Sequence, residues 1–183
     1  LAPYGEPKYI RKIEDNLIDI KEDGSFHLDM SYFDYCTGLQ MTNAKFNKLF
    51  GGPPRKSETK ITQKEMDLAA SIQLVTEKIM MRLAKSIAKE TRQKNLCLAG
   101  GVALNCVANG KLLENKIFDN IWIQPASGDA GGAIGAALAV YYLMLKNDRS
   151  IKNANDQMNG SYLGPKYSNE TVSNELNNIG AVY

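Results

Sequence analysis

The sequence predicts an α/β fold, and three features of the 183-residue chain support this prediction. A strand, a glycine turn and a helix follow one another twice between residues 95 and 146, which predicts a parallel βαβα unit. Residues 62–92 have the apolar spacing of one long helix. Near the start, the residues around Asp23 and Gly24 have the pattern of a small β-hairpin. The chain length suits about one domain, so we expect these elements to share a core.

The first 60 residues predict a small β element followed by an excursion from the core. Apolar residues flank the turn-forming pair Asp23-Gly24, and apolar and polar residues alternate from residue 26 to residue 30. This pattern predicts a partly exposed hairpin. Residues 38–60 are rich in glycine, proline and charge, which predicts a loop with one short helix.

Residues 62–92 carry the strongest helix signal in the sequence. Thr62 and Glu65 have the spacing of a capping box, which marks a helix start. Apolar residues then recur at helical spacing, and we expect them to face the core rather than a cofactor. These residues are Met66, Ala69, Ile72, Val75, Ile79, Leu83 and Ile87.

The βαβα pattern places two glycine turns at the carboxyl ends of neighbouring strands. Its parts are a buried strand (96–99), the turn Gly100-Gly101, a helix (103–115), a strand (121–123), a glycine loop (127–129) and an apolar helix (130–146). A right-handed crossover would bring both turns to one crevice. The uncharged stretch 130–145 is too short to cross a bilayer and predicts a buried helix. A polar, asparagine-rich linker (146–161) and a short amphipathic segment (168–179) should follow.

Composition excludes several classes of protein. The 22 basic and 20 acidic residues nearly balance, which argues against disorder and against a nucleic-acid-binding polycation. We therefore expect neither nucleic-acid nor membrane partners. The three cysteines lack CxxC spacing and suit a reducing, cytoplasmic location. The chain starts without methionine and ends as if a strand had begun, so we expect it to be an internal piece of a longer protein.

Gly100 and Gly101 are candidates for binding a phosphate. They end a predicted strand and open a predicted helix, where backbone N–H groups and the helix dipole attract anions. Without Cβ atoms, the backbone can approach a ligand closely. A tight turn that needs a positive φ would use the same glycines, so this pattern alone leaves both interpretations open.

Asp129 is a candidate metal ligand because it lies among Gly128, Gly131 and Gly132 at the start of the second helix. A carboxylate facing a phosphate would be repulsive unless a divalent cation lay between them. The alternative is a carboxylate that caps the helix.

Asn105 follows the first glycine turn and could bind a ribose, a base or a carbonyl through its paired donor and acceptor groups. The alternative is an exposed polar residue at a helix start. Cys97 and Cys106 adjoin the same turn without a basic neighbour, which favours packing over nucleophilic chemistry. His27 is expected at the surface, and a single histidine excludes a multi-histidine metal site within this chain.

Two motifs make the sequence recognisable: residues 95–110, Asn-Leu-Cys-Leu-Ala-Gly-Gly-Val-Ala-Leu-Asn-Cys-Val-Ala-Asn-Gly, and residues 127–137, Ser-Gly-Asp-Ala-Gly-Gly-Ala-Ile-Gly-Ala-Ala, preceded by Gln124-Pro125. With them, the chain closely resembles the carbamoyltransferase family of nodulation factors and antibiotics. Supporting matches occur at residues 1–5, 52–55, 67–73 and 162–165.

The resemblance implies half of an actin-like (ribonuclease H-like) ATPase domain, similar to that of threonylcarbamoyl-adenosine tRNA-modifying ATPase-like proteins. It also implies an ATP-dependent O-carbamoyltransferase. Such an enzyme makes carbamoyl-adenylate from carbamoyl phosphate and ATP and carbamoylates a hydroxyl of a sugar, a nodulation factor or an antibiotic-like compound. By matched motif positions, Asp129 would hold a divalent metal, iron or magnesium. The nucleotide would be bound by Gly100, Gly101, Asn105, Gly128 and Gly131. The resemblance identifies no catalytic residue in this chain.

The family pattern is present only in part. The paired histidines, spaced His-x-x-x-His, and the carbamoyl-adenylate-forming carboxyl-terminal domain do not occur in the sequence. Residues 1–147 would then belong to the transfer domain, and 148–183 would form a linker and the start of the connection to that missing domain. We expect the isolated chain to be inactive without the other lobes of the same polypeptide. An actin-like sugar kinase or other phosphotransferase, and a non-catalytic interaction fragment, are the alternative functions.

Overall fold

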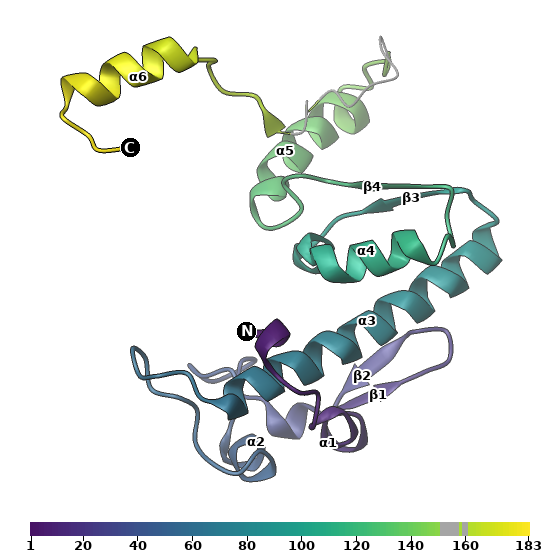
Figure 1. The fold of residues 1–183 in the computed structure, drawn as a ribbon. Coiled ribbons are helices and arrows are strands. Elements are labelled where there is room, and N and C mark those ends of the chain that lie inside the picture. The colour runs from purple at the N-terminus through teal and green to yellow at the C-terminus, as the bar shows by residue number, and fades with distance from the viewer. Residues whose placement is uncertain (151–157, 159–160) are drawn as a thin grey trace. The chain divides into compact units, whose positions relative to one another are not determined.

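The computed structural model describes residues 1–150, 158 and 161–183, and it divides the chain into two compact units (Figure 1). The first unit comprises Leu1–Leu98 and Asn105–Trp122, and the second comprises Ala99–Leu104 and Ile123–Tyr183. The structure is mixed α/β with small sheets, which confirms the predicted fold class in its general form. Most of the predicted linker 146–161 lies outside the described residues.

The hairpin predicted around Asp23 and Gly24 is present in the first unit. Strands β1 (Ile18–Ile20) and β2 (Phe26–Leu28) pair antiparallel, with Asp19 opposite His27. The Asp23 carboxylate accepts a hydrogen bond from the Ser25 N–H at 2.9 Å, and Gly24 adopts a φ of 90°. A short side-chain turn and a left-handed glycine therefore build the connection.

Several short helices lie in the same unit as this hairpin. Helix α2 (Ala44–Leu49) is the helix predicted within residues 38–60, and the Asn43 carboxamide oxygen caps it by accepting from the Lys45 N–H at 3.0 Å. The short helices are η1 (Ala2–Tyr4), α1 (Ile10–Asn16), η2 (Met30–Tyr32) and α2 (Ala44–Leu49).

Helix α3 (Gln63–Thr91) extends for 29 residues, or about 43 Å, as predicted. Its capping box is confirmed, because the Glu65 carboxylate accepts from the Thr62 N–H at 2.8 Å. The predicted core stripe is only partly correct. Val75 is buried, but Ile72 is 51% exposed and Ile87 is also exposed.

The reason for this difference is a polar contact that periodicity does not reveal. Asp67 and Ser71 are buried because the amino-terminal segment covers them. The Glu6 N–H donates to the Asp67 carboxylate at 2.8 Å, and the Tyr9 N–H donates to Ser71 Oγ at 3.0 Å. The buried face of α3 is therefore partly polar, because two backbone N–H groups bond to Asp67 and Ser71 on it.

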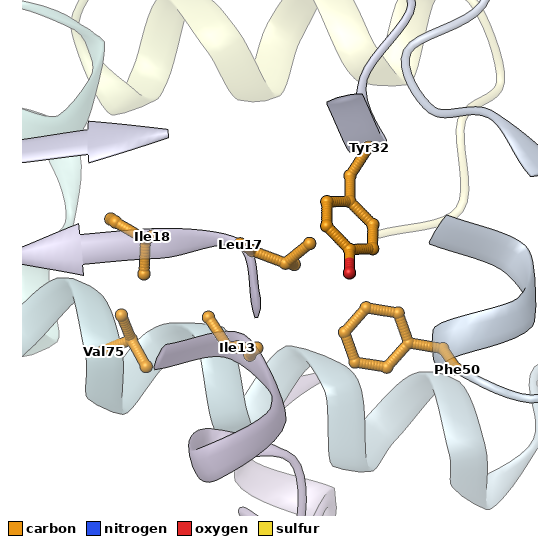
Figure 2. Close-up of a cluster of buried hydrophobic side chains, with 6 residues drawn as sticks. All are labelled: Ile13, Leu17, Ile18, Tyr32, Phe50 and Val75. Atoms are coloured by element: carbon orange, nitrogen blue, oxygen red, sulfur yellow. The ribbon is translucent and has the colours of Figure 1, made fainter. Parts of the chain in front are cut away.

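The first unit has two hydrophobic clusters, both of which include α3. Figure 2 shows the larger one, in which Tyr32 and Phe50 lie beside aliphatic side chains. Its buried members are Ile13, Leu17, Ile18, Tyr32, Phe50 and Val75. The smaller cluster consists of Ala84, Leu112 and Phe118, with partly buried neighbours that include Leu96 and Ile121. These clusters hold the hairpin and helix α4 (Cys106–Glu114) against the long helix.

The predicted order of strand, glycine turn, helix, strand, glycine turn and helix is confirmed. Strands β3 and β4 form a two-stranded sheet. The strand before Gly100 is not buried as predicted, because its residues alternate between exposed and half-buried, so only one face is covered. The elements are β3 (Asn95–Leu98), η3 (Gly101–Leu104), α4 (Cys106–Glu114), β4 (Asn120–Ile123), α5 (Ala130–Ala139), the π-helical turn η4 (Val140–Met144) and α6 (Asn169–Asn178).

The apolar helix expected at 130–146 exists, but the prediction that it is buried is wrong. No residue of α5 or η4 is buried, and Leu143 is 75% exposed. Apolar composition gives a helix the capacity to bury surface, whereas burial needs a packed neighbour. None of the helices in the described residues is long and apolar enough to span a membrane.

Candidate functional site

A hydrogen bond joins the two predicted glycine turns. The Gly100 N–H donates to the Ser127 carbonyl oxygen at 2.8 Å, and both residues belong to the second unit. The expected proximity of the two turns is therefore confirmed. The candidate site is built from residues 99–104 and 126–131, which we call the paired glycine loops.

The four candidate glycines of the paired glycine loops have different structural roles. A Cβ atom added to Gly101 or Gly128 would meet no heavy atom of the described residues within 4 Å, so the backbone there borders open space. Gly100 also borders open space, but its φ of 98° needs glycine. At Gly131, an added Cβ would lie 2.1 Å from the Ala126 carbonyl oxygen. Glycine at position 131 therefore permits the close approach to the Ala126 carbonyl oxygen, whereas Gly101 and Gly128 leave room for a ligand.

Gly101 does not open an α-helix, which corrects the predicted helix start at residue 103. The residues after it form the 3₁₀ turn η3, in which the Ala103 N–H donates to the Gly100 carbonyl oxygen at 2.9 Å. Helix α4 begins only at Cys106, because Asn105 has a non-helical backbone and caps it. The dipole of α4 therefore starts about one turn later than expected.

Asp129 precedes α5 and has an exposed side chain. Its carboxylate makes no capping hydrogen bond, although capping was the alternative explanation for this residue. It also forms no ion pair with the residues that the structure describes. The carboxylate thus retains its full capacity to accept donors or to bind a cation.

The described residues contain no group of three or more His, Cys, Asp and Glu side chains that could hold a metal ion. A divalent cation needs several ligands. Asp129 therefore fits the role of one ligand among several, and this part of the chain does not complete a metal site.

Ser127 is a feature of the site that the sequence reasoning missed. The residue is 6% exposed, and within the described residues its Oγ has no hydrogen-bond partner. Buried hydroxyls are usually paired, so an unpaired one beside a glycine loop marks a place where a donor or acceptor is expected. The only signal in the sequence was its position directly before Gly128 and Asp129.

Asn105 lies in the first unit, where it is the N-cap of α4. Its side-chain oxygen accepts from the Ala108 N–H at 3.1 Å, and its amide pairs with Gln73 on α3. Asn105 is half-buried, so it is not simply an exposed polar residue at a helix start.

The cysteines and the histidine take no part in these contacts. Cys97 and Cys106 are free and exposed, so the prediction that they pack inside is wrong. Alternation along β3 turns Cys97 away from the face that carries Leu96 and Leu98. His27 is exposed, as predicted.

Comparison with known proteins finds one matching family and several relatives. The family described as "Carbamoyltransferase N-terminus" matches residues 1–138. An uncharacterized protein of Synechocystis sp. is 59% identical over 185 residues, which cover 100% of this chain and 30% of that protein. Nodulation protein NolO of Bradyrhizobium diazoefficiens is 34% identical over 97% of this chain and 30% of its own length. Nodulation protein NolNO of Sinorhizobium fredii is 33% identical, with 96% and 24% covered. The chain thus spans less than a third of the length of these relatives.

Proposed function

Because this chain belongs to the carbamoyltransferase family, we propose that its protein is an ATP-dependent O-carbamoyltransferase. The enzyme would use carbamoyl phosphate and ATP to form a carbamoyl-adenylate, and it would transfer the carbamoyl group to a hydroxyl acceptor. Two relatives are nodulation proteins, which supports a sugar or nodulation-factor acceptor, or a comparable antibiotic-like one.

We also propose that the chain is half of an actin-like domain. The cytoplasm is the proposed location, since its reducing conditions suit three exposed free thiols.

The observation that carries this proposal is the open backbone of the paired glycine loops. Gly101 and Gly128 border open space, so a phosphate can approach the main chain. Backbone N–H groups and the amino-terminal end of α5 favour an anion at this position. Gly100 and Gly131 would serve the same nucleotide indirectly, by holding the loop conformation.

Asp129 would contribute one oxygen ligand to a divalent cation, iron or magnesium. Such a cation would neutralise phosphate charge when bound. Its other protein ligands would come from other parts of the polypeptide. The exposed carboxylate of Asp129 supports this role, because among the described residues binding a cation would break no capping bond and no ion pair of that side chain.

The test compares two labelled substrates with the whole protein. The protein is incubated with a hydroxyl acceptor, ATP and carbamoyl phosphate, with the label either on the carbamoyl carbon or on the γ-phosphate. We expect the acceptor to gain only the carbamoyl label. Transfer of the phosphate label would instead support an actin-like kinase.

We further propose that the isolated 183-residue chain completes no transfer cycle. One carboxylate leaves most of a metal's coordination to water, and closure of the site around a nucleotide needs opposing elements. Carbamoylation by the purified chain alone would contradict this proposal. A chain that binds neither ATP nor metal and only associates with another protein would favour an interaction fragment.

A further inference from the structure

A polar network in the first unit connects α3 with the start of α4. The Gln73 amide nitrogen donates to the Glu77 carboxylate at 2.9 Å and to the Asn105 carboxamide oxygen at 3.1 Å. In return, Asn105 Nδ2 donates to the Gln73 oxygen at 2.9 Å. Glu77 is buried and its second oxygen pairs with Lys111 of α4. Gln73 and Asn105 thus form a reciprocal amide pair anchored by a buried carboxylate.

The network determines which way each amide points. A carboxylate can only accept hydrogen bonds, so Gln73 must turn its amide nitrogen toward Glu77. This orientation leaves the Gln73 oxygen as the atom that accepts from an Asn105 N–H. The Ala108 N–H must meet an oxygen, so Asn105 turns its Oδ1 toward the helix start. The two constraints give the same orientation of the amide pair. If either amide flipped, it would place an acceptor against an acceptor or a donor against a donor.

The hydrogen-bond capacity of Asn105 is then almost used up. Its oxygen has two acceptor positions, which are filled by Ala108 and Gln73. One of its two Nδ2–H groups is bonded to Gln73. Among the described residues, a single Nδ2–H is left for a ligand, so the expected pairing with both a donor and an acceptor of the ligand is replaced by one donor.

We propose that Gln73 and Glu77 are positioning residues that hold the Asn105 amide so that it donates one hydrogen bond to an acceptor atom of the nucleotide. This inference rests on the proposed function and on the role in nucleotide binding that the motif match implies for Asn105. Helix capping alone does not explain the amide pair, because an N-cap needs only one oxygen. The buried Glu77 beneath the pair serves to fix its orientation.

The experiment measures ATP affinity by calorimetry in the whole protein that carries this chain. Gln73→Met keeps the side-chain length but removes the amide. Gln63→Met is a matched control: Gln63 is on the same helix, and its nitrogen likewise donates to a carboxylate four residues later, that of Asp67, at 2.8 Å. Asn105→Ser keeps an oxygen that can cap α4 and removes the donor. Glu77→Gln removes the orienting charge with little change in volume.

We expect Gln73→Met to weaken ATP binding about fivefold and Asn105→Ser about tenfold, the scale of one hydrogen bond. Glu77→Gln should weaken it about threefold through a less fixed amide, and Gln63→Met should leave it unchanged. In the Asn105→Ser background, Gln73→Met should have no further effect, because Gln73 acts only through Asn105.

Three outcomes would overturn the inference. If wild type binds ATP and both Gln73→Met and Glu77→Gln bind it equally well, the network is only structural. An equal loss in Gln63→Met would show that helix stability, not positioning, sets affinity. Wild-type protein that binds no ATP would overturn the proposed function as well, which distinguishes that failure from the other two.

Discussion

Gly5 and Gly24 in the first unit occur for a different physical reason from Gly101 and Gly128 in the paired glycine loops. A Cβ on Gly5 would lie 1.9 Å from the Met66 carbonyl oxygen, and one on Gly24 would lie 2.4 Å from the Leu83 nitrogen. In the loops, Gly101 and Gly128 have no such neighbours. Gly5 and Gly24 therefore permit close backbone packing, whereas the two loop glycines expose backbone that a ligand can reach.

The two units also differ in how many of their residues are buried. Nearly all buried residues in the described ranges belong to the first unit, and the buried residues of the second unit are Ala103 and Ser127. We infer that substitutions in the first unit, apart from those in the network of Gln73, Glu77 and Asn105, change mainly the free energy of unfolding. Substitutions in the paired glycine loops should change mainly ligand binding, with Ser127 and Gly131 as exceptions.

The largest effect is expected for Gly24→Ala, which should lower the free energy of unfolding by about 3 kcal/mol. The added methyl group would clash with the α3 backbone at the Leu83 nitrogen, and the positive φ adds strain. Gly51→Ala is the control, because Gly51 has a φ of 74° with no neighbouring atom and should lose only about 1 kcal/mol. Denaturant titration of both variants measures the difference, and equal losses would show that strain alone matters.

Asp129→Asn should reduce carbamoyl transfer about a hundredfold and lower metal content with it, because a neutral ligand compensates less charge. The free energy of unfolding should stay near that of wild type, since the carboxylate makes no capping bond. Metal analysis and transfer assays are made on the whole protein. Unchanged metal content and rate would remove Asp129 from the site.

Gly101→Val should weaken ATP binding at least tenfold, because its side chain would fill the space through which a phosphate approaches. Gly131→Ala should instead lower the melting temperature, since its methyl group meets the Ala126 carbonyl oxygen. Calorimetric affinity and thermal melting on the same preparations separate the two. Normal affinity with a lower melting temperature in Gly101→Val would assign Gly101 to packing.

Ser127→Ala should raise the free energy of unfolding by about 1 kcal/mol in the absence of ligand, because it removes a buried hydroxyl that lacks a partner. If a nucleotide satisfies this hydroxyl, the same variant should bind ATP more weakly. Ser71→Ala is a contrasting variant, because Ser71 Oγ accepts from Tyr9 and its removal should destabilise. A destabilised Ser127→Ala variant would show that the hydroxyl has a partner in solution.

The smallest effect is expected in the pH dependence of stability. The Glu6 N–H and the Gln63 amide, with Lys8, hold the pKa of the Asp67 carboxyl below its ordinary value. A lowered folded-state pKa means that this stabilisation is complete above the unfolded pKa, about 4, and is lost as the pH falls through the folded value. The difference in unfolding free energy between wild type and Asp67→Asn should therefore shrink between pH 5 and pH 2. A constant difference would contradict this assignment.

The local elements could be predicted from the sequence, because their causes are local. The Asp23-Gly24 turn, the Thr62 capping box and the alternation of strands with glycine turns depend on neighbouring residues. The structure therefore contains the predicted hairpin, long helix and order of elements. The paired glycine loops and Asp129 were found in the same way, by motif.

Burial and binding capacity could not be predicted in this way, because they depend on contacts made in the folded chain. Contacts between residues distant in the chain bury Asp67 and leave Ile72 exposed, join Gly100 to Ser127, and use up most of the hydrogen bonds of Asn105 through Gln73. The folded loop also distinguishes Gly131, which lies against the Ala126 carbonyl oxygen, from Gly101, which borders open space. Periodicity and motif record which residues could be buried or bind, whereas burial and binding capacity depend on which neighbours the folded chain brings to them.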